Sequence, residues 1–257
     1  MHKQIIILGW LTALLATLLA WAQPVSHQAY VWQRRWNDEL WEAMRRQASL
    51  FEGYAILAGE FHWQDKALTI EPIAPDMVFL AQLHKPITLV YRIHTLETVD
   101  EEEQKALDQI AKAIQVSQQK AHEAQVSVTG IQLDFDCPER LLPIYAKRLK
   151  TIREALDLHQ LSFSITGLPA WLYADGLTAV LHEVDFWVMQ VHGMERPNTA
   201  ADPSTICQME KVQPWVDRAE SYQKPFLVAL ATYGHIIGFD ETGNYLGLTS
   251  ETRLDAV

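Results

Sequence analysis

Short apolar runs recur along residues 29–233, and within several of them apolar and polar side chains alternate. Successive side chains of a strand point to opposite faces, so this alternation predicts strands with one apolar face and one polar face. The predicted strands span residues 29–36, 54–61, 87–94, 128–136, 161–168, 184–192 and 225–233.

Amphipathic helical patterns separate several of these strands. Thr98 and Glu101 have the spacing of a capping box, and the apolar side chains that follow in residues 107–114 share one helical face. The same period recurs over residues 145–156 and 212–222. Strands that alternate with helices predict parallel pairing through right-handed crossovers.

The pattern favours an α/β fold, a (β/α) barrel of the TIM type, in a single domain over residues 23–257. An open doubly wound sheet would bury both faces of its strands, whereas several strands here have a polar face. The segment 62–86 shows no regular period, and residues 235–248 read as a hairpin. With no evident eighth strand, the barrel is either incomplete or closed by a non-standard element.

Residues 1–22 are expected to be a signal peptide rather than part of the barrel. A short basic start precedes an unbroken apolar run, and a small-x-small ending at Ala20–Ala22 predicts cleavage after Ala22. Cleavage would place the protein in the periplasm or outside the cell, with no membrane contact. The alternative is an uncleaved anchor in the inner membrane, since the run is almost long enough to span a bilayer.

The net charge limits the partners that the protein is expected to bind, and the two cysteines raise the question of a disulfide. A net charge of −11 disfavours binding to nucleic acid or to anionic membrane surfaces. An oxidising compartment permits a disulfide between Cys137 and Cys207, and the alternative is two free thiols.

Polar side chains gather in the carboxyl-terminal halves of the predicted strands. In a (β/α) barrel these ends form the face on which active sites are built. The residues concerned are Glu60, Arg92, His94, Gln132, Asp134, Asp136, Gln190, His192 and Tyr233.

Asp134 and Asp136 share one face of the strand 128–136, where two carboxylates repel each other and shift one another's pKa. Hydrolysis of a glycosidic bond needs an acid for the leaving oxygen and a second group as base, nucleophile or stabiliser. Asp136, at the end of the strand, is the candidate acid. Asp134 is its electrostatic partner beside Arg92, and Glu60 is the candidate second carboxylate.

Other side chains are candidates for binding a sugar. Arg92, Gln132, Gln190, His192 and Tyr233 supply polar groups or an aromatic ring, and Trp171 supplies a ring on which a sugar could stack. Each has a structural alternative. Arg92 would then only neutralise Asp134, and a tryptophan would only pack helices onto the barrel.

The stretch "TGIQLDFD" is similar to the fourth-strand signature D-G-x-D-x-D-x-E of the family 18 chitinase-like barrels. Gly130 matches the glycine, Asp134 the third aspartate, and Asp136 takes the place of the catalytic glutamate. Thr129 and Gln132 replace the first two acids.

The segment "VMQVHG" resembles the Met-x-Tyr-Asp segment of the sixth strand in the same barrels. Met189 is retained, whereas Val191 and His192 stand in place of the tyrosine and the aspartate. Those two residues help the substrate's N-acetyl group to attack the sugar carbon, so the resemblance does not extend to that route.

A closer resemblance is to a bacterial family, the domain of unknown function numbered 3142. The blocks that resemble it are "GIQLDFDCP", "LSFSITGLPAWL", "VDFWVMQVHG" and "PFLVALATYG". The resemblance implies an exported glycosidase-like barrel, with no established activity or substrate.

Three functions fit these features. The first is a glycosidase acting on an oligo- or polysaccharide, without metal or cofactor. The second is a barrel that binds carbohydrate without cleaving it. The third is a metal-dependent hydrolase of the polysaccharide deacetylase type, with Asp134, Asp136, His94 and His192 as ligands. The sequence lacks the His-x-x-x-His pair such hydrolases use, and it leaves the sugar and the oligomeric state open.

Overall fold

The computed structural model describes residues 25–64, 67–95, 101–156, 158–193, 197, 199–202 and 205–250. The predicted signal peptide and Thr98 of the predicted capping box lie outside the described residues. None of the helices in the described part is both long and apolar enough to cross a bilayer.

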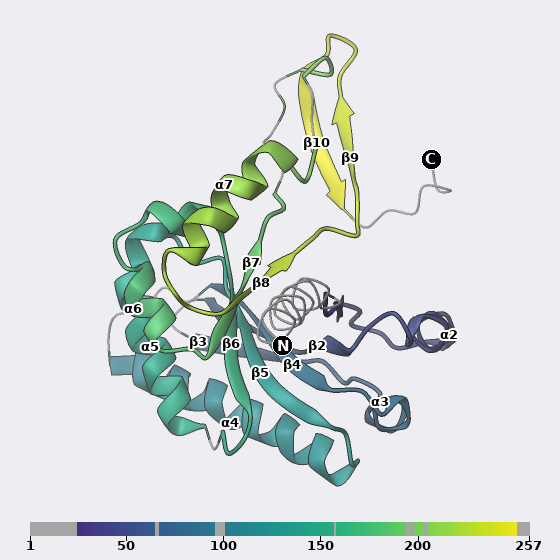
Figure 1. Ribbon diagram of the computed structural model, residues 1–257, viewed down its shortest axis with the longest axis vertical. Helices are drawn as coiled ribbons and strands as arrows, with labels where there is room; N and C mark the ends of the chain where they lie inside the picture. Colours follow the sequence, from purple (N-terminus) through teal and green to yellow (C-terminus); the bar gives the residue numbers. More distant parts are fainter. Residues whose placement is uncertain are drawn as a thin grey trace, which may run out of the picture.

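Seven parallel strands form one curled sheet, which gives the molecule the shape of a half-barrel (Figure 1). Their spatial order is β1-β2-β4-β5-β6-β7-β8, and within the described residues no pairing joins β8 back to β1. The strands are β1 (Gln28–Val31), β2 (Gly53–Gln64), β4 (Ile87–Thr95), β5 (Val128–Asp134), β6 (Ser162–Gly167), β7 (Phe186–Gln190) and β8 (Phe226–Ala229). The predicted α/β barrel of incomplete type is therefore confirmed.

The two edge strands are shorter than the sequence predicts. β1 ends at Val31 rather than at residue 36, and β8 ends at Ala229 rather than at residue 233. Each pairs on one side only, and β8 stops where its last partner, Gln190 of β7, stops. Apolar composition alone does not reveal where an edge strand loses its partner.

Helices cover the outer face of the half-barrel (Figure 1). Three of them follow the predicted helical patterns, and three were not predicted. The predicted ones are α4 (Glu101–Glu123), α5 (Leu142–Ala155) and α7 (Met209–Glu220). The others are α2 (Asp38–Gln47), α3 (Met77–Leu83) and α6 (Leu177–His182), and two short 3-10 turns occur at η1 (Glu139–Leu141) and η2 (Pro169–Tyr173).

Residues 62–64, 67–72 and 77–83 contribute to regular elements, contrary to the irregular segment 62–86 expected from the sequence. β2 continues to Gln64, and β3 (Ala67–Pro72) turns back to pair with it in antiparallel fashion. α3 begins at an N-cap, where the Asp76 carboxylate accepts a hydrogen bond from the Phe79 amide at 2.9 Å. β3 is mostly exposed, so it lacks the apolar alternation on which the strand predictions rest.

The predicted hairpin is confirmed. β9 (His235–Phe239) and β10 (Tyr245–Ser250) pair in antiparallel fashion as a separate two-stranded sheet that projects away from the half-barrel (Figure 1). Asp240 Oδ1 fixes the turn by accepting hydrogen bonds from the amides of Thr242 and Asn244, at 2.9 and 2.8 Å. The hairpin therefore does not supply the missing strand of the barrel.

The alternation along β5 separates the core from the interior of the half-barrel. Ile131, Leu133 and Phe135 are buried, and the Phe135 ring meets the edge of Tyr145 in α5 at a centroid distance of 5.2 Å. The apolar side thus packs on the helical layer, where burial supplies the main stabilising free energy. The other side of β5 directs Gln132 and Asp134 to the opposite face.

Candidate active site

The sheet register brings three charged residues level at the carboxyl ends of neighbouring strands. Glu60 of β2 is opposite Arg92 of β4, and Arg92 is opposite Asp134 of β5. Parallel strands end at the same edge of the sheet, so residues more than 70 positions apart meet there.

Asp134 is buried and surrounded by hydrogen-bond donors. Arg92 Nη1 lies 2.8 Å from Oδ2, Thr166 Oγ1 donates to Oδ1 at 2.6 Å, and Gln190 Nε2 donates to Oδ1 at 3.3 Å. Burial raises the pKa of Asp134, while the charge of Arg92 and the Thr166 hydrogen bond oppose that rise.

Asp136 lies just beyond the end of β5, with 51% of its side chain exposed. Arg92 Nη2 is 3.3 Å from its Oδ2, so a single guanidinium bridges the buried and the exposed carboxylate. Two carboxylates on the same side of a strand are tolerated here because one cation lies between them.

Glu60 forms the centre of a second cluster, and it is 1% exposed. Arg34 Nε is 2.7 Å from Oε1 and Arg34 Nη2 is 2.9 Å from Oε2, while His94 Nε2 is 2.8 Å from Oε2. Burial raises the pKa of Glu60, but the hydrogen bonds and charges of Arg34 and His94 outweigh it, so the pKa is lowered. Glu60 is thus held as a carboxylate.

Two members of the Glu60 cluster, Arg34 and His62, were not singled out from the sequence. Arg34 follows the short strand β1, and His62 lies one residue past the predicted end of the second strand. His62 shares a face of β2 with Glu60, two residues away, so extending that strand would have found it.

Gln132 is buried and hydrogen-bonded at both ends of its amide. Tyr30 of β1 donates to Oε1 at 2.5 Å, and Nε2 donates to Ser164 Oγ of β6 at 3.1 Å. Burial raises the pKa of Tyr30, and the negative charge of Asp134 adds to the rise. Tyr30 was another residue that the sequence did not single out.

His192 and Tyr233 lie together at the β7–β8 side of the site. Their rings meet edge to face at a centroid distance of 5.8 Å, and His192 Nδ1 is 3.1 Å from the Ala229 carbonyl oxygen. Tyr233 is 42% exposed, so its ring is accessible to a ligand.

The prediction that Trp171 offers a stacking surface for a sugar is wrong. Trp171 is fully buried in η2, and its Nε1 donates to the Cys137 carbonyl oxygen at 2.9 Å. Its ring packs against Tyr145 at a centroid distance of 6.2 Å. This tryptophan joins the helical layer to the end of β5.

Of the two alternatives for the cysteines, the structure has the second, because Cys137 and Cys207 are both free thiols. The Cys137 thiol is directed to the Pro138 carbonyl oxygen at 3.5 Å, and Cys207 Sγ lies 3.6 Å from Met209 Sδ. Burial raises the pKa of the Cys137 thiol to about 12. The number of cysteines in the sequence could not reveal that the two thiols have different neighbours.

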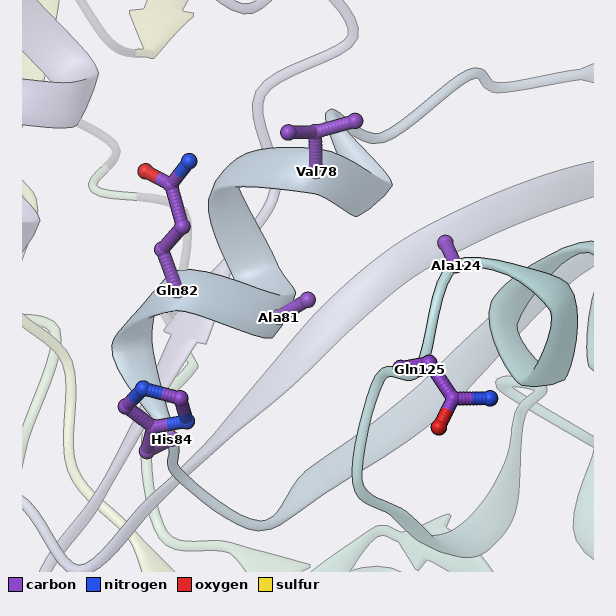
Figure 2. A pocket seen from close by; sticks show the side chains of 6 residues that line it. All are labelled: Val78, Ala81, Gln82, His84, Ala124 and Gln125. Atoms are coloured by element: carbon purple, nitrogen blue, oxygen red, sulfur yellow. The ribbon is translucent and has the colours of Figure 1, made fainter.

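A shallow hollow of about 490 Å³ lies elsewhere (Figure 2). Val78, Ala81, Gln82, His84, Ala124 and Gln125 line it. His84 and Gln125 directly precede β4 and β5, so the hollow is at the amino ends of the strands, opposite the carboxylates. It holds none of the predicted site residues, and no carboxylate lines it.

Glu60, His62 and His94 are the group in the described part of the chain whose donor atoms are close enough to hold a metal ion. The predicted ligand set of Asp134, Asp136, His94 and His192 is not brought together in this way. Only His94 is common to the two sets.

These features define an incomplete α/β barrel with paired carboxylates at the carboxyl ends of its strands. The chain belongs to the family described as Domain of unknown function (DUF3142), whose model matches residues 84–257. No curated protein sequence matches the chain.

Solved structures with a similar fold include spore cortex-lytic enzymes and chitinases. The spore cortex-lytic enzyme SleL of Bacillus megaterium QM B1551 has a TM-score of 0.58 at 16% identity, covering 89% of this chain and 57% of its own. SleL of Bacillus cereus has a TM-score of 0.59 at 18% identity, covering 88% and 55%. A chitinase from Chromobacterium violaceum ATCC 12472 has a TM-score of 0.56 at 17% identity, covering 82% and 70%. The chain therefore spans a little more than half the length of the two SleL enzymes.

Proposed function

We propose that the chain is an exported glycosidase-like barrel that hydrolyses an oligo- or polysaccharide, with Asp136 as the general acid. The observation that carries the proposal is the bridge from buried Asp134 through Arg92 to half-exposed Asp136. The glycosidase fold of the solved structures supports the same reaction class by analogy.

In this reaction the glycosidic bond breaks as Asp136 donates its proton to the leaving oxygen, water supplies the hydroxyl group that joins the sugar carbon, and the remaining proton of the water restores Asp136. Asp136 is the better-placed acid because a substrate can reach it, whereas Asp134 is covered. Asp134 acts on Asp136 electrostatically through the arginine that both share. A change in the proton on Asp134 would alter the charge beside Asp136.

Glu60, the predicted second carboxylate, is less suited to attack a sugar carbon. Both of its oxygens already accept hydrogen bonds from Arg34 and His94. Arg92, Gln190, His192 and Tyr233 remain the candidates for positioning the sugar, since they surround the two aspartates or lie at the adjacent β7–β8 side.

The proposal is tested with chitin oligosaccharides, because some of the structural neighbours are chitinases. The assay measures reducing ends released by the full chain. Asp136→Asn should lower turnover by about 10²–10⁴-fold, the usual contribution of a general acid. Asp108→Asn, an exposed site on α4, is the matched control and should leave turnover unchanged. Full activity of Asp136→Asn would show that another group protonates the leaving oxygen.

A second function, binding of carbohydrate without cleavage, is favoured by the residues in place of the chitinase tyrosine and aspartate. Val191 is buried and has no hydroxyl group, and the His192 ring faces the Ala229 carbonyl. Oligosaccharide binding by calorimetry, with no reducing ends released, would support this function. If the sugars are neither bound nor cleaved, the choice of substrate class is wrong.

Export is proposed from the pattern of residues 1–22 alone. Expression of the full chain in a bacterium should yield a periplasmic or secreted product whose mass corresponds to a start at Gln23. An uncleaved product in the membrane fraction would instead support the anchor.

A further inference from the structure

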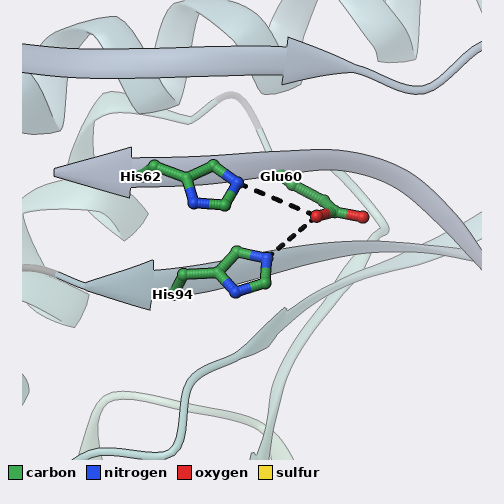
Figure 3. Close-up of side chains that lie close together, drawn as sticks. All are labelled: Glu60, His62 and His94. Carbon is green, nitrogen blue, oxygen red and sulfur yellow. Dashed lines mark hydrogen bonds and ion pairs between the residues drawn. The ribbon is translucent and has the colours of Figure 1, made fainter.

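Glu60, His62 and His94 form a compact group at the carboxyl ends of β2 and β4 (Figure 3). One donor atom from each lies within 4.8 Å of the others. His94 Nε2 is 2.8 Å and His62 Nε2 is 3.8 Å from the same oxygen, Oε2 of Glu60. Two imidazole nitrogens from neighbouring strands therefore converge on one carboxylate oxygen.

The two imidazole rings are stacked, with centroids 4.1 Å apart and an interplanar angle of 9°. A ring nitrogen of imidazole binds a metal ion through its lone pair, so the ion would replace the hydrogen bond between His94 Nε2 and Glu60 Oε2. The His62 and His94 side chains are 36% and 30% exposed, so an ion can reach them from solvent. Glu60 lies beneath them, fixed by its burial.

The surrounding charges are able to balance a divalent cation. Glu71 of β3 is directly opposite Glu60 in the sheet, and its Oε2 is 4.0 Å from His62 Nε2. Glu71 adds a second negative charge on the exposed side of His62.

The positive charge of Arg34 opposes cation binding at this group, because Arg34 Nη2 donates a hydrogen bond to Glu60 Oε2 at 2.9 Å. Its Nε binds the other oxygen, Oε1, at 2.7 Å, and its side chain is 59% exposed. A metal ion at Oε2 would have to displace Arg34 Nη2 from that oxygen, while Nε could keep its bond to Oε1. Arg34 would then orient the carboxylate from outside the coordination shell, as hydrogen-bond partners of metal ligands do.

We infer that this chain binds a divalent transition-metal ion of the zinc class through Glu60 Oε2, His62 Nε2 and His94 Nε2. Two imidazoles and one carboxylate suit zinc and its first-row neighbours better than magnesium or calcium, which prefer oxygen ligands. Three protein ligands leave a coordination position open for water or a ligand. The inference does not depend on the proposed glycosidase chemistry, because it uses neither Asp134 nor Asp136.

The test is a zinc titration of the untagged full chain, stripped with a chelator and followed by calorimetry. The chain should bind one zinc ion, and His62→Ala should weaken the affinity by at least about tenfold, the lower end of what altered metal sites lose. His182→Ala is the matched control, since its side chain is 86% exposed on α6, and it should bind zinc as the parent chain does. Cobalt(II) provides an optical check, because its visible bands should develop in the parent chain and fade in His62→Ala.

A second variant tests the assignment of Oε2 and guards against misfolding. His62 is partly exposed, so His62→Ala should keep the parent circular dichroism spectrum. Arg34→Gln removes the competing cation and should tighten zinc binding. The inference is overturned if the parent chain binds no zinc or if His62→Ala binds it equally well. Unchanged or weaker binding by Arg34→Gln would contradict the position of the ion at Oε2.

Discussion

Thr166 provides a direct test of the electrostatics around Asp134. Its hydroxyl donates to Asp134 Oδ1 at 2.6 Å, and both side chains are buried. Thr166→Val keeps the shape of the side chain and removes this donor. A hydrogen bond to a charged group contributes about 1.5–3 kcal/mol, so the free energy of unfolding at neutral pH should fall by about that amount.

The pH dependence of the stability loss in Thr166→Val distinguishes a lost hydrogen bond to ionised Asp134 from a loss of packing. Burial raises the pKa of folded Asp134 above its unfolded value, so its contribution to stability is fully present at low pH and is lost as the pH rises through the folded pKa. Without the Thr166 donor that pKa rises further, and the loss at high pH grows.

Urea unfolding of the parent chain and Thr166→Val, followed across pH by circular dichroism, measures this difference. The gap between the two proteins should be largest above the pKa of Asp134 and should narrow as the pH falls. Thr129→Val is the control, because the Thr129 hydroxyl reaches only the Ile87 carbonyl oxygen at 3.5 Å. A gap that is equal at all pH values would refute the idea that Thr166 stabilises an ionised Asp134.

Two further predictions concern packing and the thiols. Gly167→Ala should destabilise the fold by about 1–3 kcal/mol in urea unfolding, the usual cost of overpacking, because a Cβ there would lie 2.7 Å from Trp187 Cε3. Gly247→Ala, which meets no neighbour within 4 Å, should be close to neutral. In native alkylation followed by mass spectrometry, Cys207 should react first, since the Cys137 thiol is buried with its pKa raised to about 12. Recovery of a Cys137–Cys207 linked peptide from the purified protein would contradict the structure.

Much of the fold follows from periodicity in the sequence. The central strands are predictable because their apolar faces repeat every second residue, as Ile131, Leu133 and Phe135 do in β5. This periodicity does not predict β3 or α2, because β3 is mostly exposed and α2 has a single buried residue, Met44. A pattern of burial cannot predict an element that buries little.

The candidate site is only partly visible in the sequence. Arg92 is predicted as the neighbour of Asp134 from the alternation along the strands and from the need of a buried charge for a partner, and the sheet register places the two directly opposite each other. Arg34 and Tyr30 could not be predicted, since their positions depend on β1 pairing at the edge of the sheet next to β2. Trp171 is a residue that the sequence wrongly assigned to the site. A tryptophan that follows the end of a strand can pack in the core as readily as it can stack on a sugar.

In the two carboxylate clusters, hydrogen bonds and positive charges offset the burial of the carboxylate to different extents. This difference suits the two clusters to different roles. Glu60 receives donors at both oxygens, and its pKa is lowered, so it remains an anion that attracts cations. Asp134 shares its arginine with Asp136, and burial still raises its pKa. A carboxylate with a raised pKa keeps its proton to a higher pH, which acid catalysis needs and metal binding does not. We therefore propose Asp134 and Asp136 as the pair for proton transfer, and Glu60 with its histidines as the place for a metal ion.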